Sequence, residues 1–98
     1  MYDLPESEIL YFTIHRNAIS VHTETASFFY PTSFEQILSA YHDKGFERVD
    51  RSYIAQLTQI QGYDESRQSI YFGNNDFIPV SAKNYPRILQ HIRERKET

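Results

Sequence analysis

The chain has 98 residues, enough for one domain and too few for two separate domains. It contains no cysteine, which excludes disulfides, thiolate metal sites and cysteine nucleophiles and fits a reducing cytoplasm. The formal net charge is -3, which opposes nucleic-acid binding unless the basic residues gather on one surface. No apolar run approaches the ~18 residues of a membrane span, and the first residues, MYDLPESE, lack a signal-peptide pattern.

The first residues differ from the rest of the chain in charge. Residues 1–8 contain three acidic residues and no basic residue, so they account for the whole negative net charge. With Pro5 and several acids, this segment is expected to be a flexible acidic leader. Residues 9–95 are then expected to form a single domain, because a chain of this size buries somewhat over ~60% of its unfolded surface.

Three short strands are expected after the leader. Residues 9–14 form a continuous run of apolar and aromatic residues of strand length. Residues 15–17 are a polar turn, and residues 18–23 alternate between two faces, so the pair predicts a β-hairpin. A second turn leads to a third strand at residues 26–30, which Pro31 ends.

A helix is expected next. Thr32 or Ser33 can cap its start. The apolar residues that follow recur at helical spacing and should face the core; they are Phe34, Ile37, Leu38 and Tyr41. Gly45 suits the position just past the C-terminus of this helix, where a left-handed backbone is common.

The middle of the chain alternates between apolar and polar pieces. Residues 46–49 are a short extended piece, and residues 50–52 are a charged, exposed loop. An apolar patch follows at residues 53–55, and residues 57–63 form a strand-like run.

The last part of the chain predicts a hairpin, an end strand and a helix. A loop at residues 64–67 leads to a strand at 68–72, and a Gly-Asn-Asn-Asp turn leads to a short edge strand at 77–80. The final helix is expected at residues 82–95, capped by Ser81 or Asn84.

Pro86 fits the first turn of that helix if Asn84 is the cap, but it would disturb a helix that begins at Ser81. The pattern of about seven short strands and two helices predicts a mainly β or α+β fold.

Residues 45–60, GFERVDRSYIAQLTQI, resemble the core signature of the LytTR family of bacterial DNA-binding domains, which reads roughly G-F-x-R-x-H-R-S-[YF]-[ILV]-V-N-x-x-x-I. The resemblance continues in SIYF at residues 69–72 and IPVS at 78–81, and it covers roughly residues 8–92. It implies an elongated stack of small antiparallel sheets, with loops from one side entering DNA. Two residues depart from the signature: Asp50 stands where the family usually has His, and Gln56 where it has Asn.

The resemblance also implies a function. A LytTR-like regulator binds double-stranded DNA sequence-specifically in the cytoplasm, with loops that read base edges in successive major grooves and other groups that hold phosphates. Family members bind imperfect direct repeats as two protomers, and many have a receiver domain upstream. This chain is therefore expected to be a stand-alone regulator or the effector domain of a larger response regulator.

Arg51 and Ser52 are the first candidates for DNA contact. Arg51 offers a planar fork of donors, and Ser52 is a small donor and acceptor, which suits phosphates or base edges. The alternative is a solvated loop with an incidental arginine. Asp50 beside them repels phosphate, or it orients Arg51 or accepts a bond from cytosine N4.

Further candidates lie in other loops. His15, Arg16 and Asn17 form the first hairpin turn, and Asn17 also has a structural reason to be there because it tolerates a left-handed backbone. Lys83 and Asn84 follow the IPVS segment, where the family commonly has Arg in place of Lys83; the alternative is a surface lysine in the first turn of a helix.

The remaining residues are candidates for phosphate contact, each with a structural or solvent-exposed alternative. Arg67 and Gln68 begin a strand and are either phosphate contacts or exposed to solvent. Arg48 fits the Gly-Phe-x-Arg part of the signature and either contacts phosphate or pairs structurally with an acid.

Other functions receive less support. A protein-interaction module with little affinity for DNA is the main alternative, favoured by the acidic leader and Asp50. The chain is not expected to be an enzyme or to need a cofactor, because it has no Gly-rich phosphate loop and no Gly-x-Ser-x-Gly motif. His22, His42 and His91 lie on three predicted elements without metal-ligand spacing, so no metal site is expected.

Overall fold

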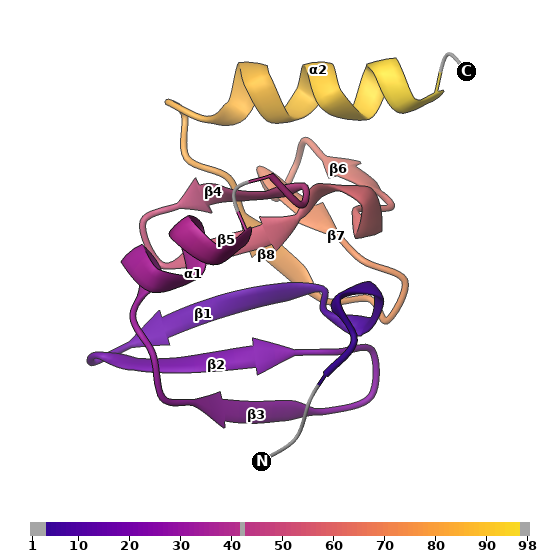
Figure 1. Ribbon diagram of the computed structural model, residues 1–98. Helices are drawn as coiled ribbons and strands as arrows, with labels where there is room; N and C mark the ends of the chain where they lie inside the picture. Colours follow the sequence, from indigo (N-terminus) through magenta and orange to yellow (C-terminus); the bar gives the residue numbers. More distant parts are fainter. Residues whose placement is uncertain (1–3, 42, 97–98) are drawn as a thin grey trace.

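The computed structural model describes residues 4–41 and 43–96, with side chains up to residue 94, and it contains two antiparallel sheets and two α-helices (Figure 1). The larger sheet has the strand order β3-β2-β1-β5-β4, and its strands are β1 (Tyr11–His15), β2 (Ala18–His22), β3 (Ser27–Tyr30), β4 (Phe46–Asp50) and β5 (Tyr53–Gln56). The smaller sheet has the order β6-β7-β8, and its strands are β6 (Gly62–Asp64), β7 (Ser69–Tyr71) and β8 (Phe77–Pro79). The predicted mainly β fold with two helices is confirmed.

The helices pack on different parts of the two sheets. The first helix, α1 (Phe34–Tyr41), contacts β4. The second, α2 (Tyr85–Lys96), contacts the 3-10 helix at Leu57–Gln59 and lies at the opposite end of the molecule from β3 (Figure 1). The molecule is elongated, with extents of 38, 26 and 25 Å along its principal axes.

The larger sheet is buried on both faces along β1 and β5. Successive side chains of a strand point to opposite faces, and two separate apolar clusters alternate along these strands. Phe12 and Ile54 pack with α1 in one cluster, whereas Tyr11 and Ala55 pack with the smaller sheet and α2 in the other. This double burial explains why residues 9–14 read as a continuous apolar run.

A β-bulge in β4 adapts this strand to both clusters. Arg48 pairs with Ile54 and Asp50 with Tyr53, so Val49 is an extra residue without a partner in β5. Val49 is fully buried in the cluster under α2, whereas Phe46 of the same strand is buried in the cluster under α1.

Two predicted elements are wrong in place or type. Residues 53–56 form strand β5, because they pair with both β1 and β4, so the apolar patch predicted at 53–55 is a central strand. The strand predicted at 57–63 is instead a short 3-10 helix (Leu57–Gln59) followed by β6. This segment crosses from one sheet to the other, and Leu57 N–H bonds the carbonyl of Gly45, 2.8 Å away.

Smaller corrections concern the ends of elements. Gln68 lies in the loop before β7 with a φ of 50°, so it does not begin that strand. Gly45 has the expected positive φ of 82°, but α1 ends at Tyr41, so the glycine closes the turn after the helix. The last helix begins at Tyr85, directly after Asn84 and three residues later than predicted, so Pro86 lies in its first turn.

The described part of the predicted leader is docked on the larger sheet. Glu6–Glu8 form a 3-10 helix, and Gln56 of β5 donates hydrogen bonds to the carbonyls of Glu6 and Ile9. Glu6 also pairs with Lys44 at 2.8 Å. Residues 1–3 lie outside the described residues, and flexibility of the leader stays a prediction.

A hydrogen bond joins the two sheets directly. The hydroxyl of Tyr11 on β1 donates to Asp76 Oδ2 in the turn between β7 and β8, at 2.9 Å. Burial and this carboxylate raise the pKa of Tyr11, so the hydroxyl stays protonated and remains a donor.

Tyr11→Phe should destabilise the domain by about 1–2 kcal/mol, because it removes a buried hydrogen bond to a charged acceptor. Urea unfolding of both proteins measures this loss. Tyr71→Phe is the matched control, because no hydrogen bond to the Tyr71 hydroxyl is recorded among the described residues. Equal stability of Tyr11→Phe and the parent would show that the bond to Asp76 contributes nothing.

His22 should make the domain sensitive to mild acid. Its ring stacks on Tyr11 at 4.3 Å and bonds the hydroxyls of Thr13 and Ser27 at 3.0 Å each. Burial lowers its pKa, against an opposing effect of Asp76. The unfolded chain therefore binds the proton at a higher pH than the folded one, and stability falls as the pH drops through about 6.5 towards the folded pKa.

The measurement is the free energy of unfolding between pH 7 and pH 5. His22→Gln should lose less stability over this range than the parent. His15→Gln, at an exposed turn, is the control and should follow the parent. A parallel fall in all three proteins would assign the acid sensitivity to other groups.

Candidate nucleic-acid interface

Two of the predicted contact turns lie side by side at one end of the larger sheet. β1 runs antiparallel to β5, so the end of β1 meets the start of β5, and Ile14 N–H bonds the carbonyl of Ser52 at 3.0 Å. The β1–β2 turn and the β4–β5 turn therefore project from the same side of the molecule (Figure 1). The structure brings together His15, Arg16, Asn17, Arg51 and Ser52.

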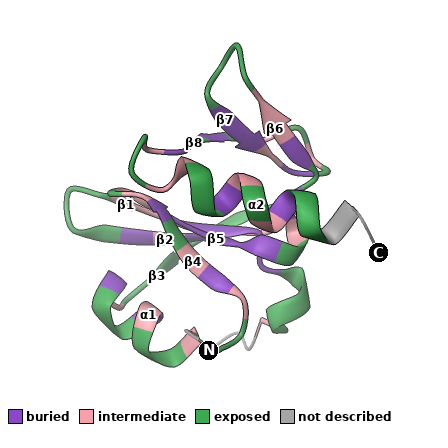
Figure 2. Cartoon of the chain, turned by 90° about the horizontal axis from the view of Figure 1, so that it is seen from above, coloured by how far each residue is buried: buried purple, intermediate pink, exposed green. Residues whose placement is uncertain are grey.

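The β1–β2 turn has the geometry of a tight hairpin. His15 pairs with Ala18, and the two residues between them, Arg16 and Asn17, have φ values of 51° and 68°. Two central residues with positive φ define a type I′ turn, which suits the twist of the strands. Asn17 tolerates this backbone well, whereas Arg16 does so rarely. Both side chains are exposed, as the colouring of this turn in Figure 2 shows.

Two side chains of β4 hold the β4–β5 turn in shape. The Asp50 carboxylate accepts the N–H of Ser52 at 3.3 Å. The Arg48 guanidinium donates to the carbonyl of Arg51 at 2.7 Å and lies 5.3 Å from the centre of the Phe34 ring. Asp50 thus orients the backbone of the turn, and no contact with the Arg51 guanidinium is recorded in the described structure. Arg48 bonds a carbonyl group and not an acid.

The linker before α2 is fastened beside this turn. Ser81 N–H bonds the carbonyl of Val49, the bulge residue, at 2.9 Å. The side-chain Nδ2 of Asn84 donates to the Ser81 hydroxyl at 2.7 Å. The main-chain carbonyl of Asn84 accepts the N–H of Ile88 at 3.1 Å. Asn84 therefore has a structural role at the start of the helix. Lys83 lies between these two anchored residues with its side chain exposed.

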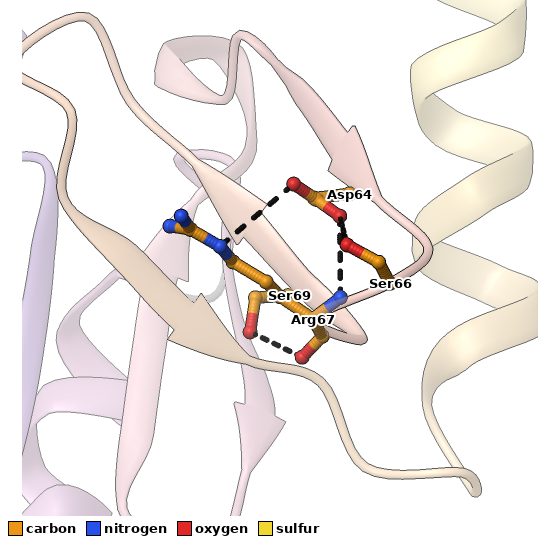
Figure 3. Close-up of polar contacts among 4 residues, drawn as sticks. All are labelled: Asp64, Ser66, Arg67 and Ser69. Atoms are coloured by element: carbon orange, nitrogen blue, oxygen red, sulfur yellow. Dashed lines mark hydrogen bonds and ion pairs between the residues drawn. The ribbon is translucent and has the colours of Figure 1, made fainter.

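The β6–β7 loop is held by Asp64 (Figure 3). This carboxylate accepts the Ser66 hydroxyl at 2.7 Å and the N–H of Arg67 at 3.2 Å, and it lies 4.0 Å from Arg67 Nε. The bond from Ser66, followed by that from Arg67 N–H, lowers the pKa of Asp64. The Arg67 guanidinium also lies 4.0 Å from the centre of the Phe77 ring. The Arg67 side chain therefore already has contacts within its own hairpin, to Asp64 and Phe77.

Gln68 connects this loop to the linker. Its carbonyl accepts the N–H of Val80 at 3.2 Å, immediately before the anchored Ser81. A continuous series of backbone bonds thus runs from the β1–β2 turn through the β4–β5 turn and the linker to the β6–β7 loop. The predicted site residues lie along this series.

The structure separates the basic residues of this side into two groups. The side chains of Arg16, Arg51 and Lys83 are exposed and form no hydrogen bond or ion pair recorded in the described part of the chain. Arg48 and Arg67 are bonded within the protein.

Arg87 is not among the predicted site residues, yet its side chain bonds strand β4 and the linker beside the contact turns. Its Nε pairs with Glu47 at 2.8 Å, and its Nη2 donates to the carbonyl of Arg48 and to Asn84 Oδ1, both at 3.2 Å. No spacing in the sequence relates residue 87 to strand β4, so only the folded structure reveals this contact.

The described residues contain neither a metal-binding cluster nor a membrane-spanning helix. No group of three or more His, Asp and Glu side chains there is placed to hold a metal ion, and His42 lies outside those residues. Neither described helix is long and apolar enough to cross a membrane.

Two changes at Asp50 should separate its structural effect from its charge. Asp50→Asn keeps an oxygen that accepts the Ser52 N–H, so thermal stability should stay within about 0.5 kcal/mol of the parent. Asp50→Ala removes the acceptor and should destabilise the domain by about 1 kcal/mol. Thermal unfolding of the three proteins measures this. Equal melting of Asp50→Ala and the parent would contradict the role of Asp50 in the turn.

Comparisons with known proteins agree with this architecture. The sequence matches the family of LytTr DNA-binding domains over residues 1–93. The fold is similar to a LytTr DNA-binding domain from Bacillus cereus, of a protein described as a methyl-accepting/DNA response regulator, with a TM-score of 0.77 and 18% identity over 91% of this chain and 84% of that one. No curated protein matches the chain. The chain therefore belongs to the LytTr family of DNA-binding domains.

Proposed function

We propose that this chain is the sequence-specific DNA-binding module of a bacterial transcription regulator that acts in the cytoplasm. The observation that best supports this proposal is the exposure of Arg16, Arg51 and Lys83 on three turns that backbone bonds hold together. Free cationic groups on a rigid frame suit phosphates and base edges. The module acts by binding alone, without a catalytic step or a cofactor.

The roles of the side chains follow from their chemistry. Arg51 has a free guanidinium fork, which suits guanine O6 and N7, and Ser52 beside it can donate or accept. Lys83 can bond the same guanine atoms without the planar fork. Arg16 lies at the tip of the first hairpin, flanked by His15 and Asn17, and suits phosphate or a neighbouring groove.

The remaining predicted residues have supporting roles in this proposal. Arg48 shapes the β4–β5 turn through the Arg51 carbonyl, and Asn84 fixes the linker beside Lys83. Arg67 and Gln68 lie in the β6–β7 loop and suit phosphate contacts at the far end of the series of turns.

The length of the molecule fits contacts in successive major grooves. The domain is 38 Å long, and equivalent positions of the major groove recur about every 34–36 Å along B-DNA. In this proposal two protomers bind an imperfect direct repeat, and a receiver domain in a larger protein regulates them.

Arg51→Ala should weaken binding to the specific duplex by about 1–3 kcal/mol without unfolding the domain, because it removes a donor fork from an exposed turn. The duplex is selected from a random pool, and its enrichment as a direct repeat tests the proposed target. Affinity and melting temperature are measured together. Arg93→Ala, at an exposed arginine on α2, is the control and should bind as the parent does. Unchanged affinity of Arg51→Ala would remove Arg51 from the interface.

Lys83→Glu should abolish specific binding, because it brings a carboxylate to the phosphates, whereas Lys83→Arg should keep or tighten binding by adding a bidentate donor. The same duplex and titration measure both changes. Parent-like affinity of Lys83→Glu would show that the linker before α2 does not face DNA.

A protein-interaction role is the second candidate, and one surface favours it. Strand β3 is at the edge of the larger sheet and is exposed along its length, with Phe29 69% exposed. Beside it lies an open groove of about 730 Å³, lined largely by apolar residues of β3, α1 and the sheet. Exposed aromatic edges of this kind mark interaction sites. Failure of the chain to bind mixed duplex DNA in a salt-dependent manner would favour this candidate.

A further inference from the structure

The guanidinium of Arg87 joins two elements that bear proposed DNA contacts. It extends from the first turn of α2 to strand β4, where it meets the Glu47 carboxylate at 2.8 Å and the Arg48 carbonyl at 3.2 Å. It also donates to Asn84 in the linker at 3.2 Å. An arginine fork with three acceptors on two elements fixes their relative position better than a single ion pair does.

The bulge in β4 supplies a second attachment at the same place. β4 is an edge strand, so its outer carbonyls are open to partners from outside the sheet. Ser81 N–H bonds the carbonyl of Val49, the residue next to Arg48. Two successive carbonyls of β4 therefore accept bonds from the linker and α2, although successive carbonyls of a regular strand point to opposite edges. The departure from regular pairing at the bulge accompanies this arrangement.

Short connections lead from Arg87 to two of the three free cations, Arg51 and Lys83. On one side, Arg48, whose carbonyl Arg87 holds, donates to the carbonyl of Arg51 at 2.7 Å. On the other side, Asn84 bonds Ser81, and Lys83 lies between these two residues. The separation of Arg51 and Lys83 is thus set by the Ser81–Val49 backbone bond together with the contacts that converge on the Arg87 guanidinium.

We propose that Arg87 is a positioning residue that sets the spacing of Arg51 and Lys83 for specific DNA recognition, a role that rests on the proposed DNA binding. Its own charge faces Glu47, so it does not act as a phosphate contact. A base-reading contact requires its donor to lie within a few tenths of an ångström of the right place, whereas a phosphate contact tolerates small shifts. Loss of Arg87 therefore lowers specific affinity and leaves non-specific affinity unchanged.

The test uses the full chain and four variants: Arg87→Ala, Arg87→Lys, Glu47→Gln and the control Arg93→Ala. Each is titrated against the selected duplex and a scrambled duplex at several salt concentrations, below its melting temperature. Arg87→Ala should lose roughly tenfold in specific affinity and less than about twofold on the scrambled duplex, with an unchanged salt slope. Arg87→Lys keeps the charge without the fork and should lose specific affinity similarly.

Glu47→Gln keeps the proposal falsifiable if Arg87→Ala does not fold. Removal of an acid near DNA would raise affinity for both duplexes if charge alone mattered. The positioning role instead requires specific affinity to fall while scrambled-duplex affinity stays level or rises.

Three results would overturn the proposal. Equal losses on both duplexes, with a salt slope smaller by about one, would make Arg87 a phosphate contact. Full binding by Arg87→Lys would show that charge and not geometry is needed. Parent-like specificity in both Arg87→Ala and Glu47→Gln would remove the residue from recognition. If the parent protein binds neither duplex, the proposed DNA binding itself fails. This outcome differs from the three above, in all of which the parent binds DNA.

Discussion

The structure depends on two central strands of the larger sheet, β1 and β5, which are buried on both faces. Strands β1 and β5 supply side chains to two separate cores, one under α1 and one under the smaller sheet and α2. β4 meets the same requirement through its bulge, which buries Val49 in one core while Phe46 stays in the other. Both cores are thus built on one central sheet, and backbone hydrogen bonds join the turns that leave it.

This double burial decides how much of the fold the sequence could predict. Elements with a clear pattern, such as the hairpin of residues 9–23 and both helices, were predicted close to their positions. β5 was not, because a short strand buried on both sides has no alternation and reads as an apolar patch. The strand predicted at residues 57–63 was wrong for a different reason. Apolar residues there fill the space between the two sheets and give a strand-like pattern, although the backbone turns.

The candidate site shows a similar division. The resemblance implied that loops from one side enter DNA, and the structure places the turns that carry His15 and Arg51 next to each other. The sequence could not tell free cations from bonded ones. Arg48 bonds the turn next to it, and Arg87 reaches a strand 39 residues away in sequence, and neither contact has a local signal. Such distinctions arise only when tertiary structure brings acceptors to a guanidinium.

The negative net charge of the chain is offset locally near the contact turns. Acidic groups near the turns are held by partners: Glu47 by Arg87, Asp50 by a backbone N–H and Asp64 by its own hairpin. Glu6 is paired with Lys44. Because salt screens exposed charges beyond about 8–10 Å, distant acids weaken the local field of Arg16, Arg51 and Lys83 only slightly. The distant acids still lower the overall attraction between the domain and DNA. In the proposed function, a domain with so few free cations gains little from non-specific binding and depends on well-placed contacts for its affinity.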